Sequence, residues 1–479
     1  MKIIALLLIL VSMFIGISPI TVSAEDAEAE EITDLCVIHG DGKVNASLSD
    51  DSIYTYAKLN TVSISCEEDV YGVYVKFDRE PLPFTVKSQG GETSVNDSYL
   101  HQYFSFGGVK EIELNFSEET SIADIYVFSQ GETPSWVQKW ETADKADIMI
   151  CPTHSDDDQL YFAGMLPWCA ANGYTVQVVY LTNHLNTHDR PHELLEGIWQ
   201  TGVKYYPLVA HFPDLYSLSL EDAISAFKAY GYEYEDFTEF YVEVLGRYKP
   251  LVVAGHDENG EYGHGAHMLN FKALTEAVEI AARDGIWDVP KTYIHSWKEN
   301  TVTFNWDEPL EYFDGKSAFN VSQEAFDAHK SQHRFESLTN WLYGTESAPI
   351  SRASQIRSHS PCRYGLYRST VGLDTTENGL FEHLTSYKEQ ADAEESSVEE
   401  SLSREESYTE ESESFEESVF VSQEDSDSLN ETTEDESSEI PSAIDNDNSL
   451  PKFAVWGLVA VSLAVLALII KKAIRKNNG

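Results

Sequence analysis

Residues Asp147-Ile148-Met149-Ile150-Cys151 form a short apolar run that is followed at once by Pro152-Thr153-His154-Ser155-Asp156-Asp157-Asp158. The apolar run predicts a buried strand, and residues 159–172 predict a helix after it. A histidine and three carboxylates packed so closely oppose one another's ionisation unless a cation neutralises them. The stretch therefore predicts a strand, a polar loop that holds a cation, and a helix.

Strands and helices continue to alternate after this stretch. Strands are predicted over residues 174–181 and 251–254, and helices over 191–200, with proline in the first turn, and over 265–283. Such alternation predicts an α/β, Rossmann-like domain with a mostly parallel sheet covered on both faces, over residues 145–387. In such sheets, ligands bind beyond the carboxyl ends of the strands.

A second polar patch follows the strand at residues 251–254 and reads His256-Asp257-Glu258-Asn259-Gly260-Glu261-Tyr262-Gly263-His264-Gly265-Ala266-His267. If the helix begins near Gly265, His264 lies at its start and His267 one turn along, so that both can face one crevice. Two strand ends then bring imidazole and carboxylate groups to one point. Two histidines, one carboxylate and an open position form a catalytic zinc set.

The two patches together resemble the motifs of the PIG-L/LmbE family of zinc-dependent N-deacetylases. That family carries His-Pro-Asp-Asp-Glu after its first strand and Tyr-Gly-His-Pro-Asp-His later, where this chain has His154-Ser155-Asp156-Asp157-Asp158 and Tyr262-Gly263-His264-Gly265-Ala266-His267. The resemblance implies that Zn²⁺ is held by His154, Asp157 and His267. It likewise implies that Asp156 is the general base, His264 the acid, and Tyr262 a contact to the reacting carbonyl.

The segment Arg190-Pro191-His192-Glu193 is similar to the family's Arg-x-x-Glu segment, which implies that Arg190 binds substrate. An ordinary charge at the start of a helix is an equally good interpretation of Arg190. The chain departs from the family pattern at Ser155 for Pro, Asp158 for Glu and Ala266 for Asp. The change at Ala266 removes a carboxylate that could orient His264, and Asp257 is a candidate to replace it.

Residues 31–135 show short alternating patterns at 70–77 and 112–116, with turn residues at 89–91 and 107–108. They predict an antiparallel β-sandwich. The run at 121–128 resembles the last strand of discoidin-like, galactose-binding-type sandwiches, which implies a targeting module or a structural spacer. Two of the domain's residues, Cys36 and Cys66, could pair, whereas Cys151, Cys169 and Cys362 of the second domain lack the paired spacing of a thiolate zinc site.

Both ends of the chain carry segments outside these domains. Residues 1–24 have the layout of a secretory signal peptide. Residues 388–450 are rich in Ser and Glu, with 23 Asp and Glu against the single Arg404 from Glu389 onwards, which predicts a disordered acidic stalk. Residues 453–470 are apolar and predict a transmembrane helix, followed by a basic cytoplasmic tail at 471–479. Together they predict a single-pass cell-membrane protein with an extracellular catalytic region.

The sequence therefore predicts a zinc-dependent hydrolase that removes the acetyl group of an N-acetylglucosamine-type sugar at the cell exterior. The alternative is a membrane-anchored glycan-binding surface protein with a degenerate hydrolase domain, which Ser155 and Ala266 favour. A metal-dependent phosphoesterase is a third hypothesis, but two metals need a richer ligand set. The expected partners are an N-acetylated glycan and the membrane. Nucleic acid is not expected as a partner, because the acidic stalk argues against it. Trp136 and Trp140 either stack on sugar rings or pack between the domains.

Overall fold

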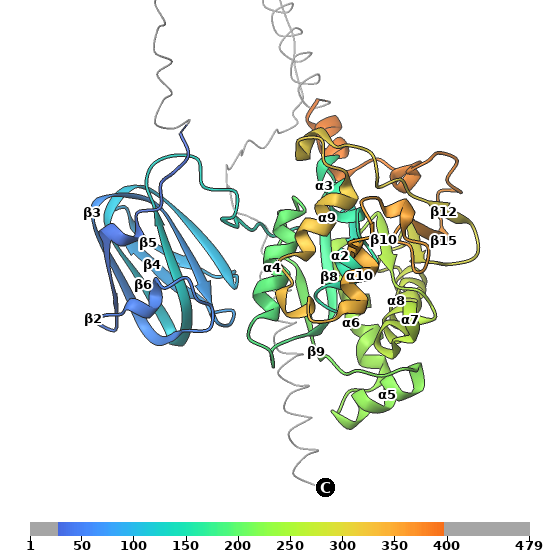
Figure 1. Ribbon diagram of the computed structural model, residues 1–479, viewed down its shortest axis with the longest axis horizontal. Coiled ribbons are helices and arrows are strands. Elements are labelled where there is room, and N and C mark those ends of the chain that lie inside the picture. The colour runs from blue at the N-terminus through green and yellow to red at the C-terminus, as the bar shows by residue number, and fades with distance from the viewer. Residues whose placement is uncertain (1–26, 397–479) are drawn as a thin grey trace, which may run out of the picture. The chain divides into compact units, whose positions relative to one another are not determined.

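The computed structural model of the chain describes residues 27–396. These residues form a β domain and an α/β domain (Figure 1). The predicted signal peptide at 1–24, transmembrane span at 453–470 and tail at 471–479 lie outside the described residues, as does the predicted stalk beyond residue 396. The first residues of that predicted stalk, 388–396, are helical.

The predicted fold class needs correction at the membrane-spanning helix. Within residues 27–396, no helix is both long enough and apolar enough to cross a bilayer. The longest of them, α8 (Gly265–Arg283), has 19 residues, but it exposes charged side chains, among them Lys272, Glu276 and Glu279. The structure describes a multidomain α/β chain, and the predictions of a membrane anchor and of a single-pass, extracellular localisation are withdrawn.

The β domain is built around one six-stranded sheet in the order β2-β1-β3-β6-β4-β5. Its elements are η1 (Thr33–Leu35), β1 (Cys36–Gly40), β2 (Lys43–Val44), η2 (Ala46–Leu48), β3 (Ala57–Phe77), β4 (Phe84–Ser88), β5 (Gly91–Val95) and β6 (His101–Phe128). β1 pairs with β3 and β4 pairs with β6, both antiparallel. β6 passes β3 twice, since Tyr74 faces both Tyr126 and Tyr103. Alternate side chains of the long strands, such as Val62, Ile64 and Leu114, are buried in the core.

The alternating patterns of the sequence lie in the long strands β3 and β6, and the predicted turn at 89–91 joins β4 to β5. The predicted turn at 107–108 is wrong, because β6 continues through it. The positive φ of Gly108 (82°) and a shift in the register with β3 between Val70 and Gly72 mark an irregularity there. Cys36 and Cys66 face each other across β1 and β3 and form a disulfide. The likeness to discoidin-like domains stays a prediction.

The α/β domain contains a seven-stranded sheet in the order β12-β15-β11-β10-β7-β8-β9. Five of these strands are parallel, namely β7 (Ile148–Ile150), β8 (Val176–Asn183), β9 (Leu208–Pro213), β10 (Val252–Gly255) and β11 (Lys291–His295). β15 (Arg363–Ser369) pairs antiparallel with β11 and with β12 (Thr301–Thr303). β7 is the first of the parallel strands and lies between β8 and β10, so the strand order reverses there. Folds of this type bind ligands at that switch point.

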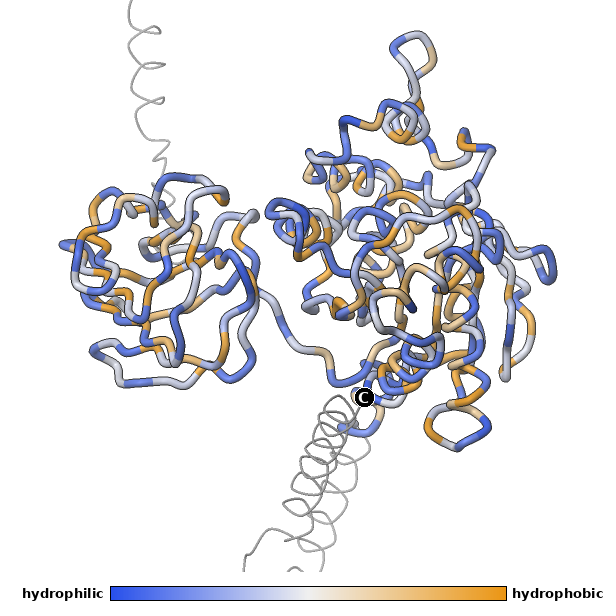
Figure 2. Tube along the Cα trace, turned by 90° about the horizontal axis from the view of Figure 1, so that it is seen from below, coloured by the Kyte–Doolittle hydropathy of each residue, from blue (hydrophilic) through white to orange (hydrophobic). Residues whose placement is uncertain are grey.

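Helices cover both faces of this sheet (Figure 1). α5 (Leu220–Ala229), α6 (Tyr234–Tyr248) and α8 pack together, whereas α9 (Ala318–Phe326) contacts α2 (Asp157–Leu160), α3 (Met165–Ala171) and α4 (Arg190–Gln200). The adjacent β7 residues Ile148 and Met149 belong to different apolar clusters, so both faces of the strand are buried. Figure 2 shows apolar segments gathered in the interior of each domain and hydrophilic segments along many of the outer loops.

The remaining elements are short and lie mostly in the second half of the domain. They are α7 (Gly260–Gly263), η3 (Glu311–Phe313), η4 (Lys330–Gln332), α10 (Glu336–Tyr343), β13 (Gly344–Thr345), β14 (Ala348–Pro349), η5 (Ala353–Gln355) and η6 (Gly379–Phe381). The predicted helix at 159–172 is divided into α2 and α3. Gly164 lies between them with φ 88°, and a side chain there would collide with Trp306.

Several contacts link the β domain and the segment after it to the α/β domain. Nε2 of His101 in β6 lies 2.7 Å from Nδ1 of His192 in α4. The buried ring of Trp140 packs against Trp199, with the ring centroids 5.1 Å apart, which favours packing over sugar stacking for this residue. Trp136 is 43% exposed and packs edge-on against Tyr74 of β3.

Candidate metal centre

The five parallel strands end at one edge of the sheet, and each places a histidine or an aspartate there. These residues are His154 after β7, His184 after β8, Asp214 after β9, His256 after β10 and His295 at the end of β11. The imidazoles are largely buried, whereas the Asp214 side chain is 41% exposed. Polar groups thus gather at the edge where folds of this type bind ligands.

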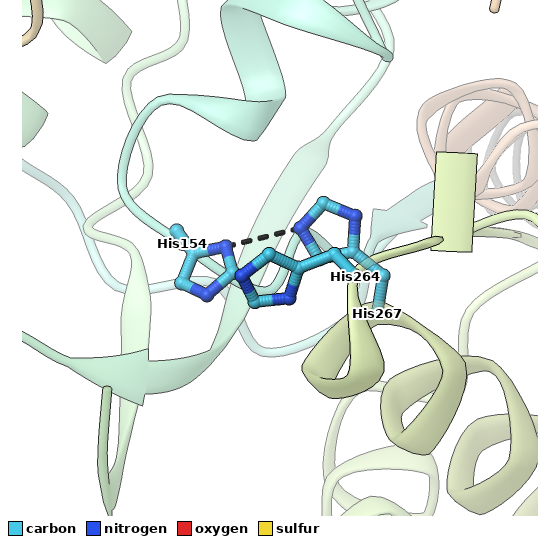
Figure 3. A group of neighbouring side chains, drawn as sticks. All are labelled: His154, His264 and His267. Carbon is cyan, nitrogen blue, oxygen red and sulfur yellow. Dashed lines mark hydrogen bonds between the residues drawn. The ribbon is translucent and has the colours of Figure 1, made fainter. Parts of the chain in front are cut away.

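The structure brings together the three side chains predicted to hold a metal. Nδ1 of His154 lies 3.0 Å from Oδ2 of Asp157 and 3.1 Å from Nε2 of His267, and the latter two atoms are 3.2 Å apart. Figure 3 shows His154 approaching from the loop after β7 and His267 from the first turn of α8. Burial raises the pKa of Asp157, but His267 and His154 together hold it well below its usual value. Three potential ligand atoms therefore face one another in a buried place.

Two other histidines lie close enough to be considered as ligands, namely His256 and His264. Both ring nitrogens of His256 are already engaged, because Nε2 accepts the Thr153 N–H at 3.0 Å and Nδ1 lies 3.0 Å from Glu261. In His264, Nδ1 accepts the Ala266 N–H at 3.3 Å and so caps the start of α8. Only Nε2 of His264 remains available, and in a neutral ring that atom carries the proton. These hydrogen bonds favour Asp157 over His256 and His264 as the third ligand.

Asp156, the predicted base, lines the cavity beside this group and is 7% exposed. Its Oδ1 accepts a hydrogen bond from Nη2 of Arg190 at 3.1 Å, and the same nitrogen lies 3.3 Å from Nε2 of His184. Burial, followed by the charge of Arg190, lowers the pKa of His184 to about 3, so this ring is a neutral partner. Arg190 is thus buried at the head of α4 and fixes the Asp156 carboxylate.

His264 and Tyr262, the predicted acid and carbonyl contact, also line the cavity, in the segment that leads into α8. Burial, followed by His154 and His267, lowers the pKa of His264 to about 2, so the resting ring is neutral and offers an N–H rather than a charged acid. The Tyr262 side chain is half exposed, and burial of its ring raises the pKa of the hydroxyl, which therefore keeps its proton. Asp257, the candidate substitute for the missing carboxylate, accepts hydrogen bonds from Asn259 instead of contacting His264.

The structure accounts for two prolines of the family pattern that this chain lacks. The backbone N–H of Ser155 donates to Nε2 of His184 at 3.3 Å, and that of Gly265 donates to the carbonyl of Ser217 at 2.8 Å. Proline has no N–H and could make neither bond. Proline at either position would therefore remove a hydrogen bond that this chain makes beside His154 and His267.

A cavity of about 620 Å³ opens onto the group. Its wall carries the polar residues described above together with Asp214. The wall also contains apolar and aromatic side chains, many of them from α10 and the turn before it, namely Leu160, Tyr161, Phe335, Leu338 and Trp341. Trp341 donates its ring N–H to the carbonyl of Ser358, which fixes the indole in this wall. The cavity can accommodate an amphipathic ligand whose polar end reaches the histidines.

Sequence reasoning missed four residues of this region, namely His184, Asp214, Glu261 and His295. The rule that ligands lie beyond parallel strand ends would have found His184 after the predicted strand at 174–181, and it would have found Asp214 and His295 had β9 and β11 been recognised. Glu261 hydrogen-bonds to three histidines, and no pattern in the sequence indicated that it would be buried.

No protein-family model matches the chain. A segment of 55 residues, 12% of this chain, is 53% identical to the 1D-myo-inositol 2-acetamido-2-deoxy-alpha-D-glucopyranoside deacetylase of Nocardia farcinica (strain IFM 10152). The chain spans only 18% of the length of that relative.

Among solved structures, the chain is similar to a conserved protein of Thermus thermophilus, with 16% identity, a TM-score of 0.30, and coverage of 48% of this chain and 97% of that one. It is also similar to N,N'-diacetylchitobiose deacetylase of Pyrococcus horikoshii, with 16% identity, a TM-score of 0.29, and coverage of 41% and 76%.

Proposed function

We propose that the α/β domain is a zinc-dependent N-deacetylase of PIG-L/LmbE type that hydrolyses the acetamide of an N-acetylglucosamine-type sugar. The observation that carries the proposal is the mutual approach of His154 Nδ1, Asp157 Oδ2 and His267 Nε2 to within 3.2 Å at the head of a cavity. The short segment of high identity to a deacetylase of a 2-acetamido-2-deoxyglucopyranoside supports the substrate class.

The residues present fit zinc. Two imidazoles and one carboxylate are a set that catalytic zinc sites use, and ligand atoms around a tetrahedral zinc lie roughly 3.3 to 3.5 Å apart. The three atoms here need to move apart by only a few tenths of an ångström to reach that spacing. When bound, zinc supplies Lewis acidity, which lowers the pKa of a water and polarises an amide carbonyl.

The protein's own groups then account for the proton transfers. Asp156, held by Arg190, accepts a proton from the attacking water as the new C–O bond forms at the acetamide carbon. The neutral ring of His264, through Nε2–H, and the hydroxyl of Tyr262 donate hydrogen bonds to the developing oxyanion. The C–N bond breaks as the leaving nitrogen takes the proton that Asp156 carried, which yields acetate and the free amine. This scheme assigns His264 hydrogen-bond donation in place of the predicted acid role.

The Asp156→Asn variant tests this proposal. Its turnover of N-acetylated saccharides, measured as acetate release, should fall by about 10²- to 10⁴-fold. Its zinc content, measured by atomic emission, should equal that of the wild type, because the three ligands are unchanged. Asp257→Asn is a matched control, since Asp257 is a buried residue nearby. Its carboxylate accepts hydrogen bonds from Asn259 and from none of the proposed site residues.

Three results would contradict the proposal: full activity in Asp156→Asn, a wild-type protein that binds no zinc, or a zinc-loaded protein that binds glycans without turnover. The last result would favour the glycan-binding alternative with a degenerate hydrolase domain.

A further inference from the structure

Glu261 is a buried carboxylate that the proposed mechanism leaves without a role. Its side chain is fully shielded from solvent, in the short segment between β10 and α8. Its backbone has φ 54° and ψ −89°, a conformation that is uncommon for any residue with a side chain. Such conformations persist where the surroundings fix them, and they are concentrated at functional sites.

The Glu261 carboxylate lies at the centre of a cluster of hydrogen-bonding groups. Oε1 lies 3.0 Å from Nδ1 of His256 and 2.9 Å from Nδ1 of His295, and it accepts the Asp257 N–H at 3.1 Å. Oε2 lies 2.6 Å from Nδ1 of His267. One side chain therefore contacts three imidazoles, and one of these rings is a proposed zinc ligand.

The partners of each ring determine which nitrogen carries its proton. His256 accepts the Thr153 N–H at Nε2, so its proton is on Nδ1 and points to Glu261. His267 lies between two carboxylates, with Nδ1 2.6 Å from Glu261 and Nε2 3.2 Å from Oδ2 of Asp157. With zinc at Nε2, as proposed, the remaining proton of the ring is on Nδ1 and points to Glu261. The ionised carboxylate is the group that makes both arrangements compatible.

We propose that Glu261 is a positioning residue of the metal centre, one that holds His267 in the tautomer and orientation that bind zinc through Nε2. This inference rests on the proposed zinc site. Position 266, where the family pattern has a carboxylate, is alanine in this chain, and the carboxylate at position 261 contacts the proposed ligand His267 and not His264. Groups that orient a ligating histidine commonly change metal affinity by about 10- to 100-fold when they are removed.

Glutamine at position 261 cannot reproduce this arrangement, although its shape is nearly the same. If its NH₂ group faces His267, the His267 proton must move to Nε2, which blocks the ligand atom. If its NH₂ group faces His256, that ring must accept at both nitrogens, because Thr153 already donates to the other one. Either orientation breaks the network, so Glu261→Gln tests the role of the charge with little change in volume.

The experiment compares zinc affinity, by competition with a chromophoric chelator, in wild type, Glu261→Gln and Asp374→Asn. Asp374 is a matched control, because its buried carboxylate accepts hydrogen bonds from Lys291 and Tyr293 and contacts none of the histidines. Zinc should bind about 10- to 100-fold more weakly to Glu261→Gln. Asp374→Asn should lower the unfolding temperature but leave zinc affinity within about twofold of the wild-type value. The absorption spectrum of the Co²⁺-loaded protein should change only in Glu261→Gln.

Unchanged zinc affinity and an unchanged cobalt spectrum in Glu261→Gln would overturn the role of Glu261 and leave the proposed function intact. A wild type that binds no zinc would overturn both. If Glu261→Gln does not fold, NMR of wild-type protein labelled with ¹⁵N in its histidine rings decides. The inference expects the His267 proton on Nδ1 when zinc is bound, and a zinc-loaded protein in which Nδ1 of His267 carries no proton would overturn it.

Discussion

Gly265 begins α8 at a point where the chain leaves no space for a side chain. A β-carbon there would lie 2.2 Å from the carbonyl oxygen of Ser219 and 2.4 Å from Oγ of Ser217. The neighbouring atoms are mostly backbone, so they cannot rotate away. The same glycine donates its N–H to Ser217, which explains in two ways why neither alanine nor proline suits this position.

The Gly265→Ala variant should therefore unfold more readily than the wild type. Forcing extra volume into a packed site costs about 1 to 3 kcal/mol. Urea denaturation would measure the loss. Gly107→Ala is the matched control, because a β-carbon at Gly107 meets nothing within 4 Å, and its effect should stay within about 0.5 kcal/mol. Equal unfolding midpoints for Gly265→Ala and the wild type would contradict the steric argument.

At the scale of elements, β6 of the β domain contacts α4 of the α/β domain through a pair of neutral histidines. Oε1 of Gln138 accepts from Trp140 at 3.0 Å and lies 2.8 Å from Nδ1 of His101, so that nitrogen carries a proton. Nε2 of His101 is then the acceptor, and His192 donates to it from Nδ1. The pair has no place for an additional proton between the two rings.

This contact should make folding sensitive to acid. Burial, followed by Lys76 and His188, lowers the pKa of His192 to about 3, and burial holds that of His101 well below its usual value. Unfolded histidines take up protons near pH 6.5. The stabilisation is therefore fully present above about pH 6.5 and is lost as the pH falls towards 3, by up to about 1.4 kcal/mol per pH unit for each histidine.

The free energy of unfolding in urea at pH 7 and pH 5 would measure this effect. His192→Asn keeps a donor for His101 but removes one titrating ring, so its loss between the two pH values should be smaller than that of the wild type by about 2 kcal/mol. His211→Asn, at an exposed histidine, serves as the control and should follow the wild type. If His192→Asn also follows the wild type, the contact does not govern the acid sensitivity.

The sequence predicted individual elements well where capping and periodicity agree. The helix at 265–283 has the predicted bounds, because His264 caps its start and charged residues mark its exposed face. The helix at 159–172 was predicted without its break, since the break depends on Trp306, which is distant in the sequence. Prediction of the site was also limited by structural features that a local sequence pattern does not reveal. The two motifs indicated His154 and His267, but the role of Glu261 depends on a left-handed backbone, which no periodicity predicts.

At the scale of the whole molecule, the proposed zinc ion should stabilise the α/β domain and leave the β domain unaffected. An ion at 100 times its dissociation constant adds about 2.7 kcal/mol to the stability of the state that binds it. Differential scanning calorimetry with and without a chelator would test this expectation, and the chelator should lower only the transition of the α/β domain. His154→Ala should show no chelator effect, and an equal shift in that variant would mean that the ion acts elsewhere.

The distribution of polar residues over five strand ends has a consequence for biosynthesis. The proposed ligands His154 and His267 are 113 residues apart, and β8, β9 and β10 intervene between them. A ribosome-bound chain that has emerged only as far as β9 contains one of the two imidazoles, so it has no pair with which to capture the ion. Metal uptake would then be a late event that follows assembly of the central strands, and the ion would lock an already formed scaffold instead of nucleating it.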